Sequence, residues 1–189
     1  MQRHRLIWLL FERHQLITAE KPQAMLHVAP EPGLAQRFAP MPHLRYVTAD
    51  LSAPSTTVRC DITAIPFEAN SFDIILCSHV LEHVPNDHQA MRELYRVLKL
   101  GGTALILVPV KGEHTFEDPS ITDPLCRERY FGQFDHVRVY GTDVRQRLQQ
   151  AGFRVQVVQA TDIVADSSEI ERMSLSVDEP IFVCHRELS

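Results

Sequence analysis

Histidines and carboxylates gather in two short stretches that follow apolar runs. His79, Glu82 and His83 come soon after the run 72–77, and Asp50 ends another run. Imidazole and carboxylate side chains bind metal ions, move protons or hold a ribose, depending on their surroundings. The elements that position these residues therefore decide which chemistry applies.

The first stretch, residues 79–83 (HVLEH), matches the pattern H-x-x-E-H of some zinc hydrolases. Two histidines four residues apart bind one zinc ion when both lie on one face of a helix, and a further ligand must come from elsewhere. His79 instead follows an apolar run almost directly, where the chain is still turning. The motif lies in the wrong context for zinc hydrolysis, and we predict no metal.

Residues 71–110 predict a strand, a helix and a second strand. The run 72–77 is typical of a strand buried on both faces. Apolar residues over 90–98 then form one stripe along a helix, which Gly101-Gly102 is predicted to end. Parallel strands joined in this way belong to an α/β sheet that binds ligands beyond the carboxyl ends of its strands. Function is therefore expected just after these strands.

Five blocks in this region resemble the class I S-adenosylmethionine-dependent methyltransferases, of the small-molecule, methyltransferase domain 11-like type. They are Asp61, Pro66-Phe67, 71–73 (SFD), 80–83 (VLEH) and 96–102 (RVLKLGG), in the family's order over about fifty residues. The resemblance implies a single-domain α/β fold with a Rossmann-like, mainly parallel seven-stranded sheet flanked by helices and an antiparallel C-terminal edge strand. It also implies S-adenosylmethionine as the cofactor.

The turn after residues 25–29 departs from the family. Ala29 and Glu31 stand where the family has its first two glycines, Gly33 keeps the third, and His27 replaces an acid. Glycines there let the backbone approach the amino-acid portion of the cofactor. Glu31 either reaches the ammonium of the methionine moiety or obstructs the pocket.

Three further residues are expected at the adenosine. Asp50 follows Ala29 by 21 positions, close to the spacing of about 20 residues at which a carboxylate binds ribose hydroxyls. By the resemblance, Asp61 accepts a hydrogen bond from the adenine amino group and Ile62 lies on the ring. The alternatives are two turn aspartates and a core isoleucine.

The tip of the central strand is expected to face the reacting methyl group. Ser78 and His79 would contact the cofactor, while Glu82 and His83 would fix the following helix. If the acceptor must lose a proton, His79, His83 and His136 are candidate general bases by their pKa class.

Residues 110–141 form a long stretch without clear periodicity. Thirty-two residues are too many for a simple connection, and they suggest an active-site lid with short helical pieces. Tyr130, Phe131, His136 and Arg138 are predicted to bind the substrate by stacking and charge-assisted hydrogen bonds. Alternatively, the aromatic residues hold the lid down and the arginines pair with acids.

Length and composition favour one domain over residues 1–189, with an N-terminal helix within 1–20. A net charge of −5 disfavours nucleic acid and anionic membranes as partners. The only early apolar cluster, residues 6–11, is too short to span a bilayer. Four scattered cysteines are best explained as buried reduced thiols, which predicts the cytoplasm. The oligomeric state is left open.

The preferred function is methyl transfer to a small-molecule acceptor. A non-catalytic module that binds S-adenosylmethionine or a nucleotide and serves a partner protein is the alternative, because the first turn is altered. A nicotinamide-dependent oxidoreductase is disfavoured, since this turn lacks the glycines that admit a pyrophosphate.

Overall fold

The computed structural model describes residues 2–164, 166–175 and 179–187, which build one central sheet. Its seven strands lie in the order β3-β2-β1-β4-β5-β9-β8. The strands are β1 (Gln23–Val28), β2 (Leu44–Asp50), β3 (Val58–Arg59), β4 (Phe72–Ser78), β5 (Leu98–Leu107), β8 (Arg154–Val158) and β9 (Ile181–His185). All run parallel except the C-terminal strand β9, which is antiparallel to β5 and β8. The predicted Rossmann-like fold is confirmed.

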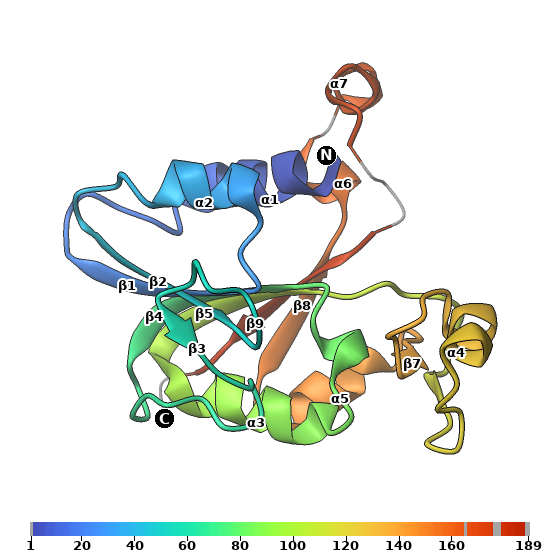
Figure 1. Ribbon diagram of the computed structural model, residues 1–189. Helices are drawn as coiled ribbons and strands as arrows, with labels where there is room; N and C mark the ends of the chain where they lie inside the picture. The colour runs from blue at the N-terminus through green and yellow to red at the C-terminus, as the bar shows by residue number, and fades with distance from the viewer. Residues whose placement is uncertain (1, 165, 176–178, 188–189) are drawn as a thin grey trace.

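Helices cover both faces of the sheet (Figure 1). One layer holds α1 (Gln2–Arg13), α2 (Pro32–Phe38), α6 (Ala160–Ile163) and α7 (Ser167–Met173), and the other holds α3 (Asp87–Val97) and α5 (Val144–Gln150). A one-turn 3-10 helix, η1 (Leu81–His83), follows β4. Among the residues described, no helix is long and apolar enough to cross a membrane.

The central strand β4 is buried on both faces, which explains why residues 74–77 are apolar without interruption. Ile75 and Cys77 pack into the cluster beneath α3 and α5, whereas Ile74 and Leu76 pack into the cluster beneath α1 and α2. Successive side chains of a strand point to opposite faces, so a strand between two helical layers must be apolar at every position. The sheet is thereby fixed from both sides, and its strand ends are held in register.

The predicted end of α3 at Gly101-Gly102 is wrong. The helix ends at Val97, and β5 begins at once with Leu98. The register against β4 then shifts, so that both glycines lie in an irregularity inside β5. A Cβ atom at Gly102 would lie 2.9 Å from the carbonyl oxygen of Asp73. These glycines therefore permit a close backbone approach instead of capping a helix.

The segment between β5 and α5 forms a small unit beyond the strand ends (Figure 1). It contains β6 (Phe116–Glu117), α4 (Pro124–Phe131) and β7 (Arg138–Val139). The two short strands pair antiparallel and form a separate two-stranded sheet. We call residues 110–141 the lid, and its short helix agrees with the expectation from the sequence.

Candidate functional site

The carboxyl ends of three neighbouring strands form the floor of the site. Val28 at the end of β1 pairs with Ala49 of β2 on one side and with Cys77 of β4 on the other. The residues that follow these three, including Asp50 and Ser78, therefore lie side by side. The clustering expected from strand ends is present.

A cavity of about 170 Å³ opens over this edge. It brings together four residues that were predicted to bind the cofactor, namely Ala29, Asp50, Asp61 and Ile62. His83 also lines it. A pocket that encloses a whole ligand measures about 300 to 1,000 Å³, so this cavity suits one part of a larger molecule.

Asp50 stabilises a turn through one carboxylate oxygen and also lines the cavity. Its Oδ1 accepts hydrogen bonds from the backbone N–H groups of Ser52 and Ala53, each at 2.7 Å. Burial acts to raise the pKa of Asp50, but these bonds outweigh it and lower the pKa below its usual value. The turn role and the ribose role are thus compatible, because the turn uses one oxygen.

Asp61 and Ile62 line the same cavity. Asp61 Oδ1 accepts from the backbone N–H and the hydroxyl of Thr63, both at 2.8 Å. Ile62 is buried, with 5% of its surface exposed. Both the turn role and a place at the cavity therefore apply to Asp61.

The first turn keeps the shape of a glycine turn without its glycines. Ala29 has φ +47°, the left-handed conformation that glycine adopts more easily. Gly33 lies in the first turn of α2, where an added Cβ would meet only His4 Nδ1, at 3.7 Å. The left-handed backbone conformation is therefore adopted by Ala29. At Gly33, by contrast, a larger side chain would meet no steric obstacle.

Glu31 points into the protein. His27, which is fully buried, lies between two partners: its Nδ1 is 2.7 Å from Tyr46 Oη and its Nε2 is 2.8 Å from Glu31 Oε2. Burial, then the charge of Glu31, raise the pKa of Tyr46, so its hydroxyl stays a donor. It donates to Nδ1, and Nε2–H donates to Glu31. Sequence reasoning missed Tyr46, because only the folded sheet brings it beside His27.

The carboxylate of Glu31 keeps its charge despite burial. Burial acts to raise its pKa, but the interactions with His27, with the nearby Ser78 hydroxyl and with a backbone N–H together outweigh that effect and lower the pKa. Its other oxygen, Oε1, is 3.7 Å from His4 Nε2 on α1. Among the residues that the structure describes, Oε1 has no hydrogen-bond partner. A buried carboxylate oxygen is thus available to a ligand.

His79 is held between two carboxylates at the tip of β4. Its Nε2 is 2.8 Å from Glu179 Oε1 and its Nδ1 is 3.2 Å from Glu82 Oε1. Burial acts to lower the pKa of His79, but these acids outweigh it and raise the pKa to about 9. The ring therefore carries a proton at neutral pH. This does not fit the expected role of His79 as a general base.

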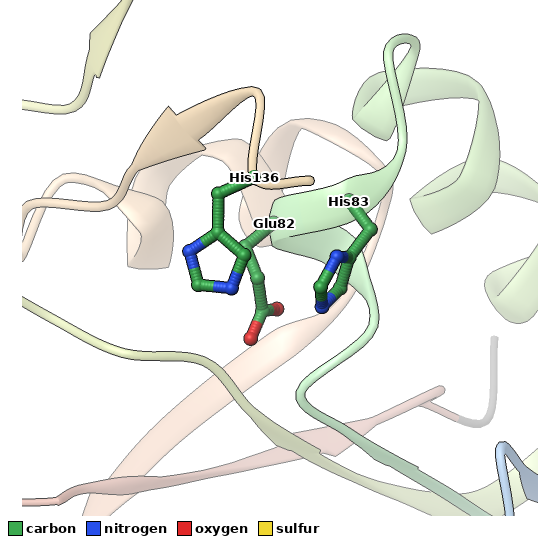
Figure 2. A group of neighbouring side chains, drawn as sticks. All are labelled: Glu82, His83 and His136. Atoms are coloured by element: carbon green, nitrogen blue, oxygen red, sulfur yellow. The ribbon is translucent and has the colours of Figure 1, made fainter. Parts of the chain in front are cut away.

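The other two candidate general bases, His83 and His136, are in contact. His83 on η1 and His136 on the lid have ring centroids 4.6 Å apart in an edge-to-face arrangement. Figure 2 shows both rings beside the carboxylate of Glu82. The lid therefore reaches the strand tips at this pair.

Two of the predicted substrate residues serve the lid itself. Phe131 is 3% exposed and packs 5.7 Å from the ring of Phe116. Arg138, also 3% exposed, donates to Glu117 and to backbone carbonyl groups of residues 81–85. Both side chains are enclosed by protein, which favours the alternative that they hold the lid in place. Tyr130 is half exposed on α4.

A fully paired group of polar residues anchors the lid. We call Asp87, Glu117, Arg138, Tyr140 and Arg147 the lid-base cluster. Asp87 accepts from the Tyr140 hydroxyl at 2.8 Å and from Arg147 at 3.0 Å. Glu117 accepts from Arg138 at 2.8 Å and from Arg147 at 2.9 Å. Each charged group of the cluster thus has a partner of opposite charge.

Residues 22–106 match the profile of a family described as methyltransferase domain. This stretch runs from the start of β1 almost to the end of β5, and the lid lies outside it. Together with the strand order and the site at the strand ends, the match supports the resemblance to methyltransferases that the motifs predicted.

Individual relatives are similar over shorter stretches. The ubiquinone/menaquinone biosynthesis C-methyltransferase UbiE of Xanthomonas campestris is 41% identical over 63 residues. That alignment covers 33% of this chain but only 25% of the relative. It therefore supports the family and leaves the acceptor undetermined.

Solved structures share the fold at low sequence identity. The [4+2]-cyclase SpnF has a TM-score of 0.68 and 16% identity, over 98% of this chain and 82% of that one. Phosphoethanolamine N-methyltransferase 2 of Haemonchus contortus, in complex with S-adenosyl-L-methionine, has a TM-score of 0.63 and 19% identity, over 96% of this chain and 53% of that one. Both confirm the fold of this chain.

The chain offers the groups that the cofactor of this family requires. Asp50 and Asp61 present carboxylates to the hydroxyl and amino groups of an adenosine, and Ile62 presents an apolar face. Glu31 has a buried anionic oxygen for an ammonium group. The residues present therefore fit S-adenosylmethionine, which the family uses as its methyl donor.

A larger cavity, about 580 Å³, lies beside the lid and was not expected. Its polar residues include His114 at the start of the lid and Arg145 and Gln146 on α5, and Pro180 before β9 completes it. No local sequence signal predicts it, because its walls come from segments far apart in the chain.

Proposed function

We propose that this protein transfers the methyl group of S-adenosylmethionine to a small-molecule acceptor. The observation that carries the proposal is the cavity that joins Asp50, Asp61 and Ile62 at the strand ends. The bound cofactor supplies a methyl group already activated by its sulfonium. The protein then contributes mainly alignment, which alone accelerates such reactions strongly.

Each residue has a distinct role in this proposal. Asp50 holds the ribose hydroxyls, Asp61 the adenine amino group, and Ile62 covers the ring. Glu31 accepts the ammonium of the methionine moiety through Oε1, while His27 keeps its other oxygen in place. Ser78, buried at the end of β4, lies next to this end of the cofactor.

The acceptor is proposed to enter beneath the lid. His83 and His136 lie there side by side, and His83 borders the adenosine cavity. They remain the candidate general bases for an acceptor that must lose a proton. Tyr130 stays a proposed contact for the acceptor, because half of its surface is exposed on α4.

The class of acceptor follows from the relatives only in outline. Their names specify a carbon acceptor in one case and a nitrogen acceptor in another. A panel of small phenols, quinols and amines therefore covers both.

The free thiols support a reducing, cytoplasmic location. They are Cys60, Cys77, Cys126 and Cys184, of which Cys126 is exposed.

Calorimetry on the full chain tests the cofactor first. We expect S-adenosylmethionine and S-adenosylhomocysteine to bind and NAD not to bind. Asp50→Asn should weaken both interactions. Asp118→Asn is a matched control, because Asp118 makes the same kind of turn bond to Ser120 outside the adenosine cavity. Absence of binding by S-adenosylmethionine would contradict the proposal.

A non-catalytic binding module is the second candidate. The Glu31–His27 pair fills the first turn with side chains where the family has glycines. SpnF has the same fold and is named as a cyclase, so the fold alone does not determine the reaction. Methyl transfer from labelled cofactor to any member of the acceptor panel supports the enzyme. Binding of the cofactor without transfer to any member favours the module.

A further inference from the structure

Glu82, His83 and His136 form a compact group of metal-ligand types. Each offers one ligand atom, and these atoms all lie within 4.8 Å of one another. Glu82 and His83 belong to η1, whereas His136 comes from the lid between α4 and β7. Figure 2 shows the carboxylate below and between the two rings.

Glu82 gives an independent reason to expect a ligand. Its side chain is 1% exposed, and neither carboxylate oxygen has a hydrogen-bond partner among the described residues. Buried carboxylates are normally hydrogen-bonded or bound to a cation, because burial of a charge is costly. His79 lies 3.2 Å from Oε1. That ion pair leaves Oε2 uncompensated, and a cation would compensate it.

The two histidines are oriented as metal ligands are. His136 Nδ1 lies 3.2 Å from the carbonyl oxygen of Phe131. A carbonyl only accepts, so Nδ1–H donates and Nε2 keeps its lone pair. His83 Nδ1 lies 3.3 Å from Asp135 Oδ2, an acceptor that favours the same tautomer. A metal-binding histidine usually donates its other ring N–H to a carboxylate or a carbonyl in this way.

We propose that Glu82, His83 and His136 bind a divalent transition-metal ion such as Zn²⁺ or Co²⁺. Two imidazoles and one carboxylate suit such ions and leave a coordination position for water or an oxygen of a bound molecule. This set differs from the H-x-x-E-H arrangement, since His136 of the lid stands in place of His79. It also revises the expectation of no metal. While the ion is bound, His83 and His136 do not act as general bases, because their free ring nitrogens are its ligands.

The site has a structural consequence. His83 is 30% exposed, so an ion can reach the group from solvent. Because His136 belongs to the lid and Glu82 to η1, an ion bound to both ties the lid to the strand tips beside the adenosine cavity.

Co²⁺ titration of the full, tag-free chain after treatment with a chelator tests the proposal. We expect one equivalent to bind by calorimetry, with the visible absorption bands of low-coordinate Co²⁺. His83→Ala and His136→Ala should each weaken binding at least about tenfold. His43→Ala serves as the control, because His43 is exposed in the turn before β2.

Glu82→Gln keeps the size of the side chain and should also weaken Co²⁺ binding, with folding checked by circular dichroism. The proposal is overturned if the wild-type chain binds no Co²⁺, or if the folded double variant His83→Ala/His136→Ala binds it as well as the wild type. Cofactor binding is measured separately on metal-free protein, so failure here is distinct from failure of the methyltransferase proposal.

Discussion

Two sets of polar residues differ in how completely their hydrogen bonds are satisfied. In the lid-base cluster, each charged group has a partner of opposite charge. At the strand tips, Glu31 Oε1 and both oxygens of Glu82 have no hydrogen-bond partner among the residues described. A saturated buried network specifies one structure, whereas an unsaturated one loses stability until something binds. The first group therefore holds the lid, and the second is available to ligands.

Removal of Arg138 should have the largest effect and should separate the two groups. Arg138→Met removes one of the two donors to Glu117 and the donor to carbonyl groups of residues 81–85. We expect a loss of about 3–5 kcal/mol in the free energy of unfolding, measured by urea titration. Arg13→Met, at the exposed end of α1, should change it little.

Protein of Arg138→Met that stays folded should bind S-adenosylmethionine nearly as well as the wild type. A specific loss of acceptor affinity with normal stability would instead restore Arg138 as a substrate residue.

Asp50 combines a satisfied and an available oxygen in one side chain, because its Oδ1 accepts the hydrogen bonds of the turn. Asp50→Ala should lower the affinity for S-adenosylmethionine by about 1.5–3 kcal/mol, roughly ten- to a hundredfold. It should also lower the melting temperature, since the N–H groups of Ser52 and Ala53 lose their acceptor. Asp50→Asn keeps that acceptor, and we expect it to lose affinity while it retains stability. Unchanged affinity in both folded variants would remove Asp50 from the site.

Glu31→Gln tests the unsaturated group directly. The amide oxygen can still accept from His27, so the unfolding free energy should change little. Loss of the charge should weaken S-adenosylmethionine binding about tenfold if Glu31 holds the ammonium. Calorimetry measures the effect, and tighter binding by the variant would show that Glu31 obstructs the cofactor.

We expect the smallest effect from the ion pairs of His79 with its two acids, which should make the free energy of unfolding depend on pH. The pKa of His79 is raised to about 9, so its ion pairs stabilise the fold fully below about pH 6.5, the pKa of the unfolded state. That contribution is lost as the pH rises through 9, and we expect about 1 kcal/mol after allowance for solvent screening. Urea titrations from pH 6 to 10 should show a shallower decline for His79→Gln than for the wild type. Parallel declines would rule out the charged pair.

Local signals explain what the sequence could predict. The strand β4 was visible because residues 74–77 are all apolar, and Asp50 because it follows Ala29 at a characteristic spacing. The role of Arg138 was not visible, since its carbonyl acceptors lie more than fifty residues earlier in the chain. The same holds for Glu179, which meets His79 only in the folded protein.

The pairing of β6 with β7 has a consequence for how new acceptor preferences arise. Phe116 pairs with Val139 and Glu117 with Arg138, so both ends of the intervening segment, 118–137, are clamped together. The entropy of closing such a loop rises slowly, by about 0.6 kcal/mol for each doubling of its length. Insertions and exchanges there are thermodynamically cheap and leave the sheet intact. Segment 118–137 can therefore vary in length and sequence, so that the same sheet can be combined with different acceptor preferences.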